Sequence, residues 1–399
     1  MEGQQQWTTR AAQSYQELAR VFAEYVSNKP EMECNCPEEL QEETSCTSCA
    51  RIARMKQSAY NQMMEGKEAL VYQLEETARY FREMEASLRR EQYLSEMEKR
   101  ELAGYLRRYH VRAREIETFY RPGKGRELSV KLRCDGAKHT MSLRLAERLI
   151  SEQLNFPVKA SCPERGYLSE EETLFLFREQ PEYYCITGVA RMVKEEQSVS
   201  GDSFSFFYEE EGELAMILSD GMGSGEEAER ESEAVLKLLE QMLSAGFKEE
   251  TAIRLINSVL ALRAEQSMFA TLDISRINLY GGTCEFIKIG GAATYIRRGN
   301  WLECVEAKTL PIGMLQQVDY DFLVKKLYDG DCIIMMSDGV LDTVRPEERP
   351  EFLRQIIGEE PGQNPQVIAG RILNASLLLQ NFEPKDDMTV LVCGVFSHK

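Results

Sequence analysis

Two apolar runs in the sequence end in the same tripeptide, Ser-Asp-Gly. The first run leads into Ser219-Asp220-Gly221, and the second leads into Ser337-Asp338-Gly339. Each run is short enough to be a buried strand, so each aspartate would stand at the tip of a rigid element. A single Asp-Gly is also an ordinary turn sequence. Its repetition after two strands indicates chemistry at the carboxylates.

Acidic residues mark two further strand boundaries. Asp202 precedes an aromatic run, and Asp386-Asp387 precedes the apolar run that begins at Met388. In an antiparallel sheet the end of one strand lies beside the start of the next, so we expect these carboxylates to gather at one end of a sheet. None of the three histidines lies near these boundaries. A metal bound there would have oxygen ligands, which suits Mg²⁺ or Mn²⁺ better than zinc.

The composition excludes several classes of protein. A length of 399 residues predicts two or three domains, and a formal net charge of −18 argues against a nucleic-acid partner or an anionic membrane surface. No apolar run approaches the length of a bilayer span, and the polar first ten residues show no signal-peptide pattern. The 11 cysteines are scattered, which predicts reduced thiols in a cytoplasmic protein.

One group of cysteines departs from that scatter. Cys34 and Cys36 form one close pair, and Cys46 and Cys49 form a second. Two such pairs in a polar loop are a candidate four-thiolate zinc site, although a single residue between the first two thiols is an unusual spacing. The alternative is a loop with unpaired thiols.

A long helical region precedes the part of the chain that is rich in strands. Residues 51–119 contain no proline, and Leu70, Leu74 and Phe81 share an apolar stripe at coiled-coil spacing. We therefore predict a helical, coiled-coil regulatory region at residues 1–120 that forms a homodimer. The alternative is that the stripe packs on its own domain. Residues 121–182 predict a small α+β module with a connecting or regulatory role.

Residues 183–399 alternate strands with pairs of helices, which predicts two packed sheets flanked by helices. Five motifs appear there in order: Gly201-Asp202-Ser203, Ser219-Asp220-Gly221-Met222-Gly223, Leu310-Pro311-Ile312-Gly313, Ser337-Asp338-Gly339 and Asp386-Asp387-Met388-Thr389. This set resembles the metal-dependent serine phosphatases of the protein phosphatase 2C (PP2C) class, and most closely the stage II sporulation protein E-like branch. The resemblance implies an α-β-β-α sandwich that binds two Mn²⁺ or Mg²⁺ ions.

The resemblance also implies a role for each motif residue. Asp220 is similar to the carboxylate that bridges both metals, and the Gly221 carbonyl to a ligand of the first. Asp338 and Asp386 resemble ligands of the second metal. Asp202 resembles the metal-site residue that holds metal-bound water.

Some positions leave alternatives open or depart from the family pattern. Asp387 is the alternative to its neighbour Asp386, since either carboxylate of the pair could point inward. Larger relatives have a phosphate-gripping arginine close before the first aspartate, where this chain has Val199-Ser200. The family's acidic residue is also absent from Gly290-Gly291-Ala292. The sequence therefore predicts no third metal and a phosphate affinity that depends mainly on the two metals.

The expected activity is hydrolysis of phosphoserine by metal-activated water, with no side-chain nucleophile. The family implies a substrate of the anti-sigma-factor antagonist type, in sporulation-type sigma-factor control. The family's membrane spans are absent, so we expect either a soluble homologue or the cytosolic part of a membrane-anchored protein. The alternatives are a pseudoenzyme that binds partners without turnover, a coiled-coil scaffold, or structural turn carboxylates that lie apart.

The sequence also suggests regulation. Two predicted helices follow Asp220 directly, joined to it by the glycine-rich stretch 221–225. Glycine can absorb a rotation that a regular strand resists. We therefore expect dimerisation of the helical region to bias this helix pair between a metal-poor and a metal-competent arrangement.

Overall fold

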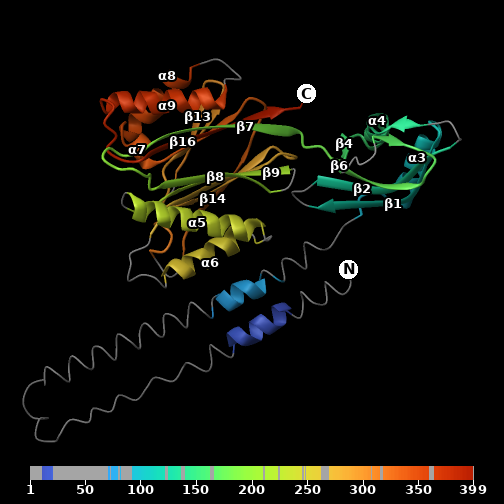
Figure 1. Cartoon of the computed structure of the whole chain (residues 1–399), viewed down its shortest axis with the longest axis horizontal. Helices are drawn as coiled ribbons and strands as arrows, with labels where there is room; N and C mark the ends of the chain where they lie inside the picture. The colour runs from blue at the N-terminus through green and yellow to red at the C-terminus, as the bar shows by residue number, and fades with distance from the viewer. Residues whose placement is uncertain are drawn as a thin grey trace, which may run out of the picture. The chain divides into compact units, whose positions relative to one another are not determined.

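The computed structural model describes most of the chain from residue 92 onward and two short helical stretches before it (Figure 1). The described residues are 11–20, 71, 73–79, 81, 92–121, 125–135, 140–161, 166–209, 212–222, 225–244, 247, 249–261, 269–306, 308–314, 318–358 and 364–398. The four cysteines of the candidate zinc site and most of the predicted coiled coil lie outside them. No helix in the described ranges is long and apolar enough to cross a membrane.

A small α+β module begins with helix α3 (Glu96–Arg107). Its N-terminus is capped by Ser95, whose hydroxyl accepts the Glu98 N–H while the Glu98 carboxylate accepts the Ser95 N–H. The other elements are β1 (Val111–Arg121), β2 (Gly125–Cys134), β3 (Met141–Ser142), α4 (Leu143–Leu154), β4 (Val158–Ala160), β5 (Tyr167–Leu168) and β6 (Thr173–Glu179). Four of these strands form one sheet in the order β1-β2-β6-β4.

The prediction that helix continues to residue 119 is wrong. Helix α3 ends at Arg107, and His110 turns the chain with a positive φ of 60°. From Val111 the chain is strand β1, which pairs antiparallel with β2. Periodicity misled the prediction because charged residues alternate with apolar ones on a half-buried strand as well as on a helix. Cross-strand pairing to β2, which is not visible in local sequence, decides between them.

The described residues of the C-terminal part form ten strands and several helices. The strands are β7 (Tyr183–Met192), β8 (Asp202–Glu209), β9 (Glu213–Asp220), β10 (Leu272–Asn278), β11 (Thr283–Ile289), β12 (Thr294–Arg298), β13 (Trp301–Val305), β14 (Asp321–Lys326), β15 (Cys332–Met336) and β16 (Met388–Ser397). The helices are α5 (Glu226–Ser244), α6 (Glu249–Ala261), α7 (Asp338–Leu341), α8 (Arg349–Ile357) and α9 (Pro365–Leu379). This order of strands and helices agrees with the alternation that the sequence predicts for residues 183–399.

These strands form two five-stranded antiparallel sheets. One has the order β14-β11-β10-β9-β8 and the other β13-β12-β15-β16-β7. Apolar side chains from both sheets share one core, to which β9 contributes Met216 and β15 contributes Met335. A second core joins the outer face of the β7–β16 sheet to α8 and α9, which cover it in Figure 1. The inner strands of both sheets are hydrogen-bonded on both sides, and their core-facing side chains are buried.

By its internal contacts the chain divides into two compact units. One comprises residues 89–236, 271–309 and 320–399, and so holds every strand described above. The other comprises residues 1–88, 237–270 and 310–319. Within the latter, Gln73 donates to the Ser258 hydroxyl of α6 at 3.4 Å, and Arg79 lies 4.0 Å from Glu250. The described part of the predicted helical region therefore contacts α6.

Candidate metal centre

The two aspartates of β8 and β9 lie opposite each other. Asp202 and Asp220 are direct cross-strand partners at the ends of these strands. The strands pair because both are rich in apolar and aromatic residues that reach the shared core. As the pairing register places the two carboxyl-bearing residues side by side, strand register alone creates the first half of the cluster.

The second half forms where β15 ends and β16 begins. The main-chain N–H of Ser337 donates to the Thr389 carbonyl at 3.0 Å, and the Thr389 N–H donates to the Ser337 hydroxyl at 2.9 Å. Ser337 directly precedes Asp338, and Thr389 follows the Asp386-Asp387 pair. This reciprocal clamp therefore holds the second set of acidic residues together.

Glycine is needed at two points where main chains approach closely. A Cβ on Gly339 would stand 2.2 Å from the Asp387 carbonyl oxygen, and one on Gly221 would stand 2.2 Å from the Ala228 carbonyl oxygen. Neither distance is physically accessible to a side chain. The glycine of each Ser-Asp-Gly motif is thus explained by packing. The missing side chain lets α7 approach the Asp386-Asp387 turn at Gly339 and lets α5 approach the end of β9 at Gly221.

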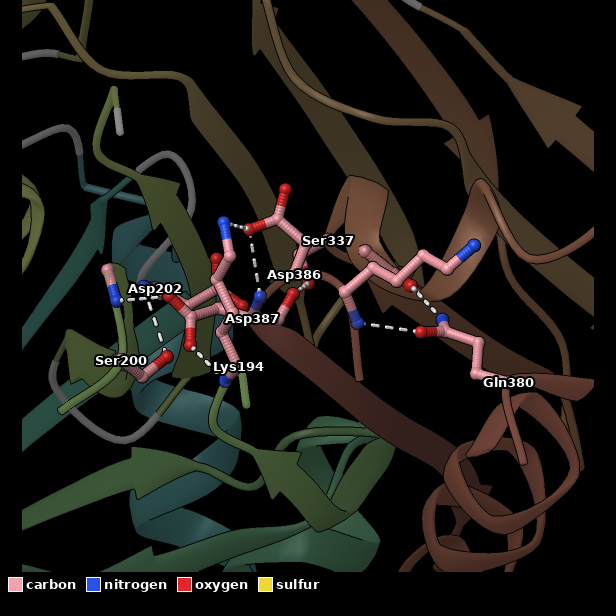
Figure 2. Close-up of polar contacts among 10 residues, drawn as sticks. Lys194, Ser200, Asp202, Ser337, Gln380, Asp386 and Asp387 are labelled. Carbon is pink, nitrogen blue, oxygen red and sulfur yellow. Dashed lines mark hydrogen bonds and ion pairs between the residues drawn. The ribbon is translucent and has the colours of Figure 1, made fainter. Parts of the chain in front are cut away.

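Asp387 links the start of β16 to the segment between β7 and β8. One of its carboxylate oxygens accepts the Gly201 N–H at 2.8 Å, and the other accepts the Lys194 N–H at 2.9 Å (Figure 2). The side chain is 4% exposed. Asp386 is different: its carboxylate keeps about half of its surface exposed and lies 3.9 Å from the Lys194 ammonium. Both oxygens of Asp387 are therefore committed to main-chain hydrogen bonds, whereas Asp386 accepts one such bond, from the Asp387 N–H to its Oδ1 at 3.0 Å, and its other oxygen has no main-chain donor among the described residues.

Thr271, just before β10, holds the backbone of Asp220 on both sides. Its N–H donates to the Asp220 carbonyl at 2.8 Å, and its hydroxyl accepts the Asp220 N–H at 3.1 Å. Its carbonyl accepts the Ser219 hydroxyl at 2.8 Å. Three hydrogen bonds from one residue leave Asp220 little freedom. The sequence analysis missed Thr271, because no local pattern marks a residue that pairs with a strand some fifty positions away.

Asp202 is the most deeply buried carboxylate of the cluster. It is 2% exposed, and neither of its carboxylate oxygens has a hydrogen-bond partner in the described structure. Burial raises its pKa to about 6, an effect that the nearby hydroxyls of Thr389 and Ser337 partly oppose and that Asp387 and Asp338 reinforce. A buried carboxylate without donors is costly unless a cation neutralises it.

The neighbouring carboxylates act most strongly on the pKa of Asp220. Burial, followed by the charges of Asp202, Asp338, Asp386 and Asp387, raises its pKa to about 9. Asp338 is exposed by surface area, but the surrounding protein still removes part of its water. This desolvation, followed by Asp386 and Asp342, raises the Asp338 pKa as well, while a side-chain hydrogen bond with Asp220 opposes the rise.

These observations fit a divalent cation with oxygen ligands. The donors are carboxylates, Asp220 holds a proton that a cation would displace, and Asp202 has buried oxygens without partners. Among the described residues, no three His, Cys, Asp or Glu side chains already form a group arranged to hold a metal ion. The described carboxylates are therefore neighbours that do not form a preformed cation cage.

The structure brings together all five aspartates that the sequence singled out, and Gly221 follows directly after one of them. The interpretation of these carboxylates as structural turn residues that lie apart is therefore wrong, because the negative charges of the other four all raise the pKa of Asp220. A surface pocket lined by Arg297, Arg354 and Gly358 shares no residue with this cluster and offers no carboxylate to a cation.

Comparison with known proteins agrees with the motifs. Residues 210–396 match the family model for stage II sporulation protein E. Stage II sporulation protein E of Priestia megaterium is 38% identical over 211 residues, which cover 53% of this chain and 36% of that protein. The Bacillus subtilis protein of the same name is 26% identical over 383 residues, which cover 96% of this chain and 45% of that protein.

A solved structure extends the likeness to three dimensions. The PP2C phosphatase domain of stage II sporulation protein E from Bacillus subtilis, with a fragment of its regulatory domain, superposes with a TM-score of 0.63 at 25% identity. The match covers 89% of this chain and all of that one. By these matches the chain is similar to the stage II sporulation protein E-like serine phosphatases of the PP2C class. It spans less than half the length of the two curated relatives described above.

Proposed function

We propose that this stage II sporulation protein E-like chain is a metal-dependent protein phosphatase. Its substrate would be phosphoserine on a small regulatory phosphoprotein of the anti-sigma-factor antagonist type. The observation that carries the proposal is the cluster of Asp202, Asp220, Asp338 and Asp386 at one end of the two sheets, with a raised pKa at three of these residues. In this proposal the two sheets and their helices form the family's α-β-β-α sandwich.

Two bound Mg²⁺ or Mn²⁺ ions would supply charge neutralisation at the phosphoryl group and an activated water. The chain's own residues position that chemistry. Asp220, between Asp202 and Asp338, is the carboxylate we assign to both ions, and the Gly221 carbonyl follows it. Thr271 holds the Asp220 backbone with three hydrogen bonds to it and its neighbour. Asp338 and Asp386 would provide further carboxylate oxygens to the ions.

The structure supports a choice between the two adjacent aspartates before β16. We assign the ligand role to Asp386 and a positioning role to Asp387, because the oxygens of Asp387 already accept the N–H groups of Lys194 and Gly201. Asp387→Asn should therefore disturb the loop before β8 more than it disturbs metal charge balance. Asp386→Asn should do the reverse.

The test is phosphate release from phosphoserine-bearing anti-sigma-factor antagonists, with and without Mn²⁺. Asp220→Asn keeps the size of the side chain and removes its charge, so activity should fall by more than about 100-fold while the fold persists. Near-parental activity of this variant at saturating Mn²⁺ would refute the assignment. A folded parent chain that binds the phosphoprotein and never releases phosphate would instead favour the pseudoenzyme or scaffold.

Further parts of the proposal lie outside the described residues. We propose that Cys34, Cys36, Cys46 and Cys49 hold a structural zinc ion and that the helical region forms a homodimer. We also propose that the chain works on the cytoplasmic side, either alone or as part of a membrane-anchored protein. The likeness to a solved phosphatase domain that carries a regulatory fragment supports a regulatory role for the region before residue 121.

A further inference from the structure

Lys194 stands at the edge of the carboxylate cluster, two residues after β7. Its main-chain N–H donates to Asp387 Oδ1 at 2.9 Å, which anchors the residue at the cluster. Its ammonium nitrogen lies 3.9 Å from Asp386 Oδ1 (Figure 2). The backbone and the side chain of one residue therefore face two adjacent aspartates. The sequence analysis did not single out this lysine, because nothing in its neighbourhood resembles a motif.

The ammonium is only loosely held. A separation of 3.9 Å allows an ion pair and exceeds the length of a direct hydrogen bond. The side chain retains 35% of its exposure and sits on a flexible four-carbon stem. The contact is therefore weak, and small rotations of the stem can bring the ammonium to a ligand beside Asp386.

A phosphoserine substrate needs such a cation. A phosphate monoester carries about −1.5 to −2 charges near neutral pH and must approach five aspartates. The arginine of larger relatives is absent from this chain at Val199-Ser200. Arg191, a second cation near the cluster, already donates to the Asp202 carbonyl at 2.7 Å and lies over the Phe204 ring. Lys194 is the cation whose position at Asp386 leaves it open to a new partner.

We propose that Lys194 is the residue that binds the substrate phosphate, in the role that an arginine fills in larger relatives. In the metal-free protein its ammonium partly neutralises Asp386. Once a divalent cation takes over that charge, the ammonium contacts a phosphoryl oxygen of the substrate. This inference rests on the proposed phosphatase function, and it adds a binding residue that the two metals do not supply.

The competing explanation is that Lys194 only stabilises the carboxylate cluster. Lys194→Met tests the phosphate-binding role against this structural explanation, because methionine keeps the main-chain hydrogen bond to Asp387 and the apolar stem but removes the charge. Lys385→Met is a matched control: Lys385 directly precedes Asp386, is exposed, and forms no ion pair with another described residue. Lys194→Arg restores the charge.

The experiment measures binding of inorganic phosphate to the full chain at saturating Mn²⁺ by isothermal titration calorimetry, which requires no turnover. Loss of a charge-assisted hydrogen bond predicts a phosphate dissociation constant that is about 10- to 100-fold higher in Lys194→Met. Lys194→Arg should recover much of this loss, and Lys385→Met should match the parent. The Mn²⁺ dissociation constant of Lys194→Met should be equal to or lower than that of the parent, because a competing cation has gone.

Two results would overturn the proposal. One is a phosphate dissociation constant in Lys194→Met within twofold of the parent. The other is weaker Mn²⁺ binding in that variant, which would show that the lysine organises the cluster instead of binding phosphate. Failure of the proposed function looks different: the parent chain would release no phosphate from phosphoserine proteins, while the dependence of phosphate binding on Lys194 could still be observed.

Discussion

Binding of Mn²⁺ to this chain should become tighter as the pH rises. The structure raises the pKa of Asp220 to about 9, so this carboxyl carries a proton across the neutral range when no cation is bound. A cation that uses both Asp220 oxygens must displace the proton. Each pH unit below about 9 should therefore weaken the apparent affinity about tenfold, which is about 1.4 kcal/mol per unit.

The magnitude follows from the pKa values of Asp220 and Asp202. Between pH 6.5 and 8.5 one proton is released per site, so the apparent Mn²⁺ affinity should rise about 100-fold. Below pH 6 the slope should steepen, because Asp202, with a pKa of about 6, also becomes protonated. Calorimetry in buffers with different ionisation enthalpies measures the number of protons released. Asp220→Asn is the control: binding should be weak, and its slope between pH 6.5 and 8.5 should be nearly flat.

Stability without metal should show the opposite trend. The folded state holds the Asp220 proton up to pH 9, whereas the unfolded chain loses it near pH 4, so the folded state binds more protons between these values. Metal-free protein should therefore lose stability as the pH rises through that window, and Mn²⁺ should remove much of the loss. An Mn²⁺ affinity that stays constant from pH 6.5 to 8.5 in protein that is folded throughout would refute the reasoning.

Three other predictions concern residues outside the carboxylate cluster of Asp202, Asp220, Asp338, Asp386 and Asp387. Lys288 and Asp273 form a fully buried ion pair, so Lys288→Met should lower the free energy of unfolding by about 3–5 kcal/mol in chemical denaturation. Adding Asp273→Leu should restore most of that stability, because it removes the unpaired buried charge. A Lys288→Met variant as stable as the parent would contradict this prediction. Protein prepared without chelator should contain one zinc, lost in a Cys46→Ser, Cys49→Ser variant; zinc-free parent protein would exclude the site. A charged residue at Leu74 should abolish self-association and change Mn²⁺-dependent activity together; a parent that sediments as a monomer at all concentrations would refute the coupling.

The coarse architecture of the C-terminal part could be predicted from sequence because its strands have recognisable local sequence patterns. Runs such as 332–336 are short, wholly apolar and bounded by turn residues, and the structure buries every residue of β15. Local patterning failed between residues 111 and 119, where alternating charged and apolar residues suit helix and strand equally. Phe81 is instructive as well, since it stacks on Tyr15 at 5.6 Å between ring centroids. Part of the predicted dimer stripe is therefore satisfied within the chain.

The different roles of the carboxylates within the site could not be predicted from sequence, and the Asp386-Asp387 pair shows why. Two identical neighbouring side chains are distinguished only by where residues almost two hundred positions away place their N–H groups. Those N–H groups satisfy Asp387 completely and leave Asp386 facing the Lys194 ammonium. A carboxylate already satisfied by main-chain donors gains little from a cation, whereas its exposed neighbour, crowded by other acidic groups, gains much. We therefore expect metal affinity at this site to depend on how many oxygens are still free of main-chain donors, and not only on how many carboxylates are present.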